Sequence, residues 1–114
     1  MSRQAFPLLT STIIAAGAIT EARFVTSAQV QAGAGVNALG VARMTAASGD
    51  TITVDVLGTA VVEAGAALTA GGPLQTDASG RAIDKAAGAT VARLLPGQSA
   101  SAAGQFVEVL LIPN

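Results

Sequence analysis

Chain-breaking residues recur along this sequence at intervals too short for ordinary helices. Between residues 61 and 83 the breaks fall at Ala64-Gly65, at Gly71-Gly72-Pro73 and at Asp77-Ala78-Ser79-Gly80. Breaks of this composition, about six to ten residues apart, are typical of β-hairpin turns. The sequence therefore predicts an all-β fold: a small single-domain β-barrel or sandwich of roughly seven to nine short strands, with Gly-rich turns and at most one or two short helices.

Two segments carry the clearest strand patterns. Residues 51–57, "TITVDVL", alternate polar and apolar side chains with the period of a half-buried strand, with Asp55 on the polar side and Gly58 marking the end. Residues 106–112, "FVEVLLI", end at Pro113, which cannot donate to a sheet ladder. Weaker strand patterns lie at residues 22–27, 40–44, 59–63, 66–69, 74–76, 81–84 and 91–95.

Two further features bear on the fold. Alanine favours helix, and short helical turns are the competing interpretation over residues 38–47 and 85–89. Val41-Ala42-Arg43 followed by residues 51–57 is echoed by Val91-Ala92-Arg93 followed by residues 106–112, with a longer connection in the second copy. This is either one strand pair used twice or a chance similarity in an Ala- and Val-rich chain.

The charge content limits the kind of partner. Only 11% of the 114 residues are charged and the formal net charge is −1, whereas soluble domains average about 25% charged residues. The low charge and the scattered basic side chains argue against nucleic-acid binding, which uses a clustered basic face. Because interface cores are depleted of charge, we expect other protein to cover much of this surface. The basic residues are Arg3, Arg23, Arg43, Arg81, Lys85 and Arg93.

Several reactive side chains are missing altogether. The sequence has no histidine, cysteine, tryptophan or tyrosine. Without imidazole no serine of the chain has the usual general base, and without thiols there are neither disulfides nor thiolate metal sites. We therefore expect a protein that is not an enzyme and has no cofactor.

Three segments resemble sites but have simpler explanations. Asp77, Ser79 and Asp84 lack the further acidic ligands of a calcium loop, and a turn in which Asp77 binds backbone N–H groups and Gly80 takes positive φ explains them. The glycine-rich residues 33–40 lack the Gly-Lys-Ser/Thr of a phosphate loop. Lys85, the single lysine, has no carrier-domain motif around it. We expect no metal or cofactor site.

The N-terminal segment is apolar but interrupted. Residues 6–19, "FPLLTSTIIAAGAI", are too short and too often broken by polar residues to span a bilayer, and we expect no membrane association. A secretory signal is the alternative interpretation. The preferred one is an extended arm, residues 1–12, that leads into a single β domain, residues 13–114.

The order of strands and turns resembles a family of tailed-bacteriophage capsid decoration proteins, also called head-stabilising or cement proteins. The glycine placement around the strands and the "D.SGRA" turn carry most of the resemblance. The matching segments are "PLLT" near the N-terminus, "ARFVTSA" at 22–28, "LGVARMTAASGDTITVDVLG" at 39–58, "VVEAGAALTAGGPLQTDASGRA" at 61–82 and the closing "AAGQFVEVLLIP".

The resemblance implies a structural protein that binds the outer surface of an expanded phage head, commonly as a homotrimer, and stabilises contacts between major capsid proteins. It would be found in the virion, and in the bacterial host cytoplasm during assembly. We expect the arm to order on the capsid, for example by strand addition. The alternative is a non-viral, secreted or surface β-rich binding or adhesion module. The expected capsid-binding residues are Ser2, Arg3, Gln4, Phe6, Pro7, Leu8 and Leu9.

Overall fold

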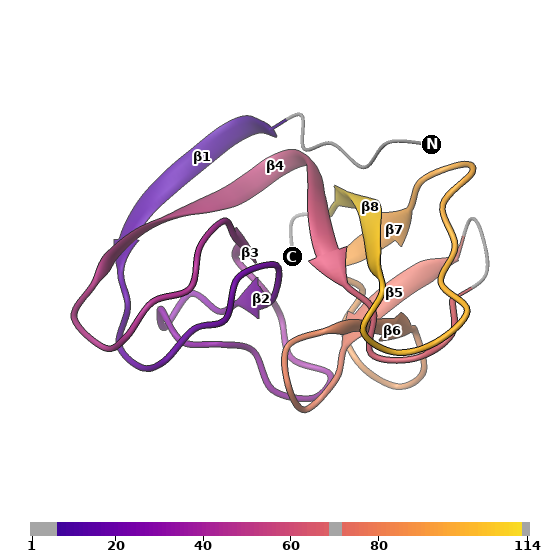
Figure 1. Ribbon diagram of the computed structural model, residues 1–114, viewed down its shortest axis with the longest axis horizontal. Coiled ribbons are helices and arrows are strands. Elements are labelled where there is room, and N and C mark those ends of the chain that lie inside the picture. Colours follow the sequence, from indigo (N-terminus) through magenta and orange to yellow (C-terminus); the bar gives the residue numbers. More distant parts are fainter. Residues whose placement is uncertain (1–6, 69–71, 113–114) are drawn as a thin grey trace.

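The computed structural model describes residues 7–68 and 72–112, and these form a single antiparallel sheet of eight strands (Figure 1). The strand order is β2-β3-β4-β8-β7-β5-β6, and β1 pairs with β4 beside this path. The described residues contain no helix, so the predicted all-β fold is confirmed. The strands are β1 (Pro7–Ile14), β2 (Phe24–Val25), β3 (Gly40–Ala42), β4 (Thr51–Glu63), β5 (Pro73–Thr76), β6 (Ala82–Asp84), β7 (Ala92–Leu94) and β8 (Phe106–Leu111).

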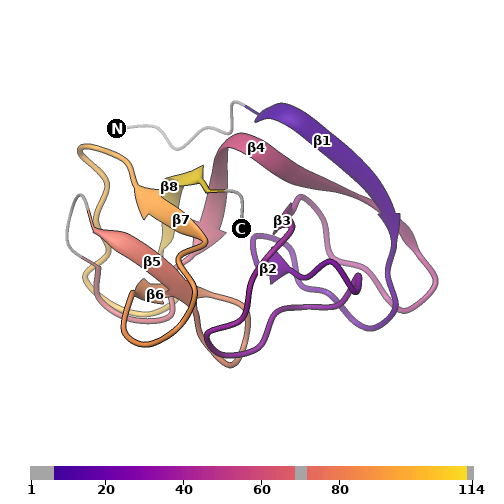
Figure 2. The same cartoon turned by 180° about the vertical axis from the view of Figure 1, so that it is seen from behind.

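The longest strand, β4, joins the two ends of the molecule. The predicted stop at Gly58 is wrong, because β4 runs through this residue, whose φ of 96° suits a residue without a side chain. Before Gly58, β4 pairs with β1 and β3; after it, β4 pairs with β8. Both cartoon views show β4 bending between these two sets of partners (Figures 1 and 2). A glycine inside the strand thus redirects it without ending it.

Two clusters of buried side chains lie on either side of the β2–β3 pair. Alternate residues of a strand point to opposite faces. Phe24 and Val41 therefore join a large cluster with β4–β8, while Val25 and Ala42 join a small cluster with β1 and the first half of β4. The small cluster consists of Ile13, Ala15, Ile19, Val25, Ala42, Ala46, Ile52 and Val54. The β2–β3 pair is buried on both faces and holds the two clusters together.

The strands around the large cluster close on themselves. β4, β8, β7, β5 and β6 are neighbours in that order, and Ala82 of β6 forms a single parallel pair with Ala64, directly after β4. The backbone N–H of Gly65 donates to Ala82 O at 2.8 Å. This contact completes a small barrel-like ring.

The turn between β5 and β6 has the predicted construction. Asp77 Oδ1 accepts hydrogen bonds from the backbone N–H groups of Ser79 at 2.8 Å and Arg81 at 2.9 Å. Gly80 has a φ of 76°. The Asp77 side chain therefore satisfies two backbone donors of its own turn.

Among the residues that the structure describes, the strand predicted at residues 66–69 and the helical turns considered at 38–47 and 85–89 do not form, because contacts with distant segments outweigh the local preferences there. Residues 66–68 form no strand, because buried Leu68 makes only a single pair with Ala100, and Thr69 lies outside the described residues. Neither alanine-rich segment is helical. Residues 40–42 form β3, and the backbone N–H groups of Ala86 and Gly88 donate to the buried Gln75 side chain.

Both copies of the internal similarity form an antiparallel strand pair. Val41 of β3 lies opposite Asp55 of β4, and Arg93 of β7 lies opposite Leu110 of β8, the position equivalent to Asp55. The second pair is therefore shifted by two residues relative to the first. A shift of two preserves which side chains face inward.

Candidate functional site

The N-terminal strand carries the exposed part of the predicted capsid-binding arm. Residues 7–12 belong to β1, which pairs with β4, so the boundary predicted after residue 12 falls within this strand. Leu8 is 85% exposed and Leu9 51% exposed, and Pro7 is partly buried. Ser2, Arg3, Gln4 and Phe6 lie outside the described residues. The described part of the arm therefore presents two leucines to solvent at the start of a sheet strand.

One edge of β1 is available for pairing. β1 pairs with β4 along one edge, and within residues 7–68 and 72–112 no other strand pairs with it. The register with β4 is irregular between Pro7 and Thr10, beside Gly58. An open strand edge is a template for another extended chain unless side chains or twist block it. This edge has the chemistry of a strand-addition site.

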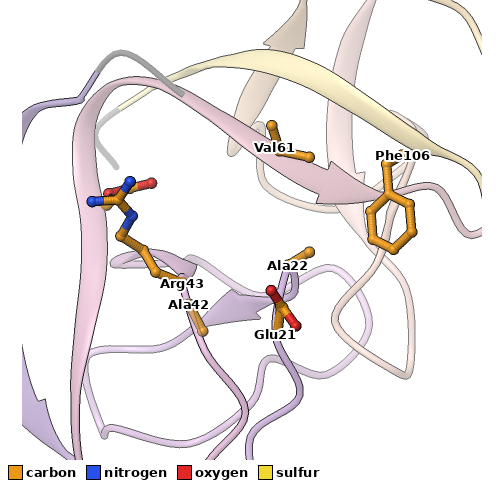
Figure 3. A pocket seen from close by; sticks show the side chains of 7 residues that line it. Glu21, Ala22, Ala42, Arg43, Val61 and Phe106 are labelled. Atoms are coloured by element: carbon orange, nitrogen blue, oxygen red, sulfur yellow. The ribbon is translucent and has the colours of Figure 1, made fainter. Parts of the chain in front are cut away.

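A pocket of about 320 Å³ opens where β4 bends (Figure 3). Segments from across the fold form it: the loop before β2, the end of β3, both halves of β4 and the start of β8. Figure 3 shows Arg43 at one end of the pocket and Phe106 at the other. The lining residues are Glu21, Ala22, Ala42, Arg43, Asp55, Val61 and Phe106.

Asp55 is the chemically distinctive member of this pocket. The residue is only 3% exposed. Its Oδ1 lies 3.4 Å from Arg43 Nε in an ion pair but accepts no hydrogen bond. Burial raises the pKa of the Asp55 carboxyl above its usual value of 3.8, and the Arg43 charge partly offsets this. The pocket therefore contains a buried carboxylate whose hydrogen-bonding capacity is incompletely used.

In a second charged cluster, the acidic and basic side chains are paired with one another. Glu63, at the end of β4, forms ion pairs with Arg23 at 3.2 Å and Arg81 at 3.6 Å. Arg81 also pairs with Asp77 at 3.1 Å, and Arg23 Nη1 donates to Ser79 O at 3.1 Å. These contacts fix the β5–β6 turn against β2 and the end of β4. We call Arg23, Glu63, Asp77 and Arg81 the clasp.

The remaining candidate segments have structural roles. Gly35 N–H donates to Thr76 O at 3.0 Å, and the Gly35 backbone packs against Gly88, so the glycine-rich segment is held against the barrel. Lys85 Nζ donates to Ala86 O at 3.1 Å in an exposed turn. In the described part of the chain, no three acidic, histidine or cysteine residues are grouped to hold a metal ion. Nor does any helix there have the length and apolar character to cross a bilayer.

Sequence patterns alone did not find the pocket. Strand alternation assigned Asp55 to the polar side of β4 with Thr51 and Thr53, and Arg43 was one of several scattered basic residues. On the side of β4 expected to face solvent, Asp55 is instead buried, and its side chain lies beside that of Arg43, the residue directly after β3. The available clue was an aspartate among Val, Thr and Leu residues, with an arginine directly after the strand that pairs with it.

The comparisons with known proteins agree with the fold. A model of the phage cement protein family matches residues 4–111. The crystal structure of the head fiber gp8.5 N base in bacteriophage phi29 is similar, with a TM-score of 0.72 and 19% sequence identity. The similarity covers 91% of this chain and 93% of that chain and shows a shared fold. A search of curated protein sequences gives no match.

Proposed function

The chain belongs to the phage cement protein family, and from this premise we propose that it fastens neighbouring major capsid proteins on the outside of an expanded head. Its role is that of a structural decoration protein of the phage capsid. We expect it to fold in the bacterial host cytoplasm and to remain in the virion. The family match argues against a non-viral adhesion module, as does the lack of tryptophan and tyrosine for stacking on sugars.

The proposed attachment element is the N-terminal arm continued into β1. Leu8 and Leu9 are exposed next to the open edge of β1. A partner strand on that edge would gain backbone hydrogen bonds, while the two leucines and Phe6 would bury apolar area. The exposure of these leucines on a paired strand is the observation that carries the proposal.

Trimerisation would make this attachment tight. One short strand binds weakly because it loses conformational entropy on ordering. Three arms on one trimer act at high effective concentration once the first has bound. The low charge of the chain supports extensive contact with other protein. Light scattering should give a mass of about 33 kDa, three times the 11.1 kDa chain; an 11 kDa particle would contradict a trimer in solution.

The attachment is tested by mixing protein with expanded heads that lack it and measuring co-sedimentation. Deleting residues 2–12 would remove most of β1, so the informative variant is the double substitution Leu8→Ser and Leu9→Ser. It should retain the wild-type thermal midpoint because both side chains are exposed, yet lose occupancy on heads. Val36→Ser, which alters a 40% exposed side chain outside β1, is the matched control.

Two results would contradict the proposal at different levels. Full occupancy by the Leu8→Ser, Leu9→Ser protein would exclude the leucines as capsid anchors. Failure of the wild-type protein to bind any expanded head of its own phage would exclude the decoration role itself.

A further inference from the structure

In the pocket at the bend of β4, the buried acid Asp55 has an ion pair with Arg43 but no hydrogen-bond donor at its Oδ1. Asp55 is almost completely removed from solvent, and its Oδ1 accepts no hydrogen bond. Leaving a buried polar atom without a hydrogen bond lowers stability, and the cost is larger when the group is charged. Arg43 supplies an opposite charge at 3.4 Å, but its side chain remains 45% exposed. Asp55 therefore has unused capacity for a hydrogen-bond donor.

The charges of the pocket favour a positively charged ligand. Two carboxylates, Asp55 and Glu21, line it against one guanidinium, Arg43. Glu21 is exposed, so it can offset the charge of an incoming cation. A carboxylate ligand would meet Arg43 but would be repelled by both acids.

The apolar part of the lining suits a long side chain. Val61 and Phe106 line the pocket together with Ala22 and Ala42, and Phe106 is 42% exposed. Figure 3 places Val61 and Phe106 away from Arg43. Basic side chains bury an aliphatic stem along apolar surface and place the charged group at a polar site. The arrangement offers packing surface for the stem and an acid for the head.

We propose that this pocket receives an arginine side chain from the capsid protein on which the chain sits. The guanidinium has several N–H donors in a planar fork, which suits a carboxylate better than a single ammonium group does. Because Asp55 Oδ1 has almost no accessible surface, the 45% exposed Arg43 side chain moves aside to let the guanidinium donate to this atom. The stem of the incoming arginine packs on Val61 and Phe106. The identity of the partner rests on the proposed function; the chemistry of the pocket does not.

The pocket chemistry is tested on the isolated protein with a small probe. Amide NMR spectra are recorded during titration with N-acetyl-arginine N-methylamide. We expect saturable shifts at Ala42, Asp55 and Phe106, with a dissociation constant on the order of 1 to 10 mM for so small a ligand. The citrulline analogue, which is similar in shape but uncharged, should give no saturable shifts. Saturation by both probes, or by neither, would overturn the proposal, as would preferential binding of N-acetyl-glutamate N-methylamide.

Three variants distinguish binding in the pocket from a general effect of the protein's net charge. Asp55→Asn and Glu21→Gln should each weaken arginine binding several-fold, whereas Asp84→Asn, which removes an exposed acid outside the pocket lining, should leave it unchanged. Glu21 is exposed, so its variant remains informative if Asp55→Asn fails to fold. If all three substitutions weaken arginine binding equally, the binding depends on net charge alone, and the proposed site is wrong.

Head binding then separates this inference from the proposed function. If the capsid supplies the arginine, Glu21→Gln should lower the affinity for heads while the oligomer mass stays unchanged. Normal affinity would overturn the capsid as the source. If the wild-type protein decorates heads but the probe does not bind, only the pocket inference fails. If the probe binds but the wild-type protein does not decorate heads, the decoration role fails.

Discussion

The two core clusters differ in how strands surround them. The large cluster takes side chains from every strand except β1 and lies inside the closed ring of β4 to β8. The small cluster lies under the β1–β4 ribbon, and Ile13 is the single buried residue of β1. Burial on all sides removes more apolar area from water. We infer that the ring supplies most of the stability, while β1 keeps exposed side chains for contact with a partner.

A cavity in the large cluster should therefore lower the free energy of unfolding more than a cavity in the small cluster does. Leu74→Ala removes a fully buried side chain from the large cluster and should lower the free energy of unfolding by roughly 2 to 5 kcal/mol. Ile52→Ala in the small cluster should cost less, because loops and the β1 ribbon can relax around the cavity. Urea unfolding followed by circular dichroism measures both, since the chain lacks tryptophan and tyrosine.

Leu8→Ala is the control for this comparison, because it truncates an 85% exposed leucine and should change stability by less than about 0.5 kcal/mol. An Ile52→Ala cost equal to or above that of Leu74→Ala would contradict the ranking of the clusters.

A substitution that displaces the β2–β3 pair should loosen the packing of both clusters, because this pair contributes side chains to each of them. In Gly40→Ala the new Cβ would overlap the Asp55 carbonyl oxygen and lie 2.9 Å from Val54 Cγ1. Because the obstacle is backbone, β3 must move away from β4, at a cost of about 1 to 3 kcal/mol. Backbone amide hydrogen exchange should become faster in the strands around the large cluster and in those around the small cluster.

Gly33→Ala is the matched control for this substitution, since a Cβ at residue 33 would meet nothing within 4 Å. If exchange in Gly40→Ala accelerates in β1 and β3 alone, the clusters open independently and the coupling through β2–β3 is wrong.

The clasp is expected to make a smaller contribution. Glu63→Gln removes the charge that pairs with Arg23 and Arg81, both only partly exposed. We expect a loss of about 1 to 2 kcal/mol, because hydrogen bonds to partly buried charged groups exceed surface ion pairs in value. Thermal unfolding of Glu63→Gln is compared with that of Glu21→Gln, which alters an exposed acid. Equal midpoints for the two variants would exclude an energetic role for the clasp.

The smallest expected effect is a pH dependence at Asp55. Because burial raises the pKa of this carboxyl, the folded protein binds its proton more tightly than the unfolded chain does. Stability from this group is therefore greatest below pH 3.8 and falls as pH rises from 3.8 through the raised pKa. The stability of Asp55→Asn minus that of wild type should grow across this range and then level off.

Urea unfolding of both proteins at several pH values gives this difference directly, and the other acids cancel in the subtraction. A difference that shrinks as pH rises would mean that the Arg43 attraction outweighs burial at this carboxyl.

Local sequence patterns predicted much of the fold because turns and strand alternation are short-range properties. The Asp77–Gly80 turn and the strands at 51–57 and 106–111 follow from them. The strand end predicted at Gly58 is wrong because a positive φ inside a strand depends on which strands flank it. The arm was proposed from its apolar residues, but its pairing with β4 is a contact across more than forty residues of sequence.

The sequence by itself determined the fold class, the absence of imidazole and thiol chemistry, and the resemblance to capsid decoration proteins. Each of these depends on residue type or on spacing within about ten residues. The tertiary structure decided that Asp55 is buried beside Arg43 and that Glu63 joins two arginines from distant segments. Such groupings depend on strand order and on the bend of β4, which local patterns do not encode because pairing between distant strands is a property of the whole chain.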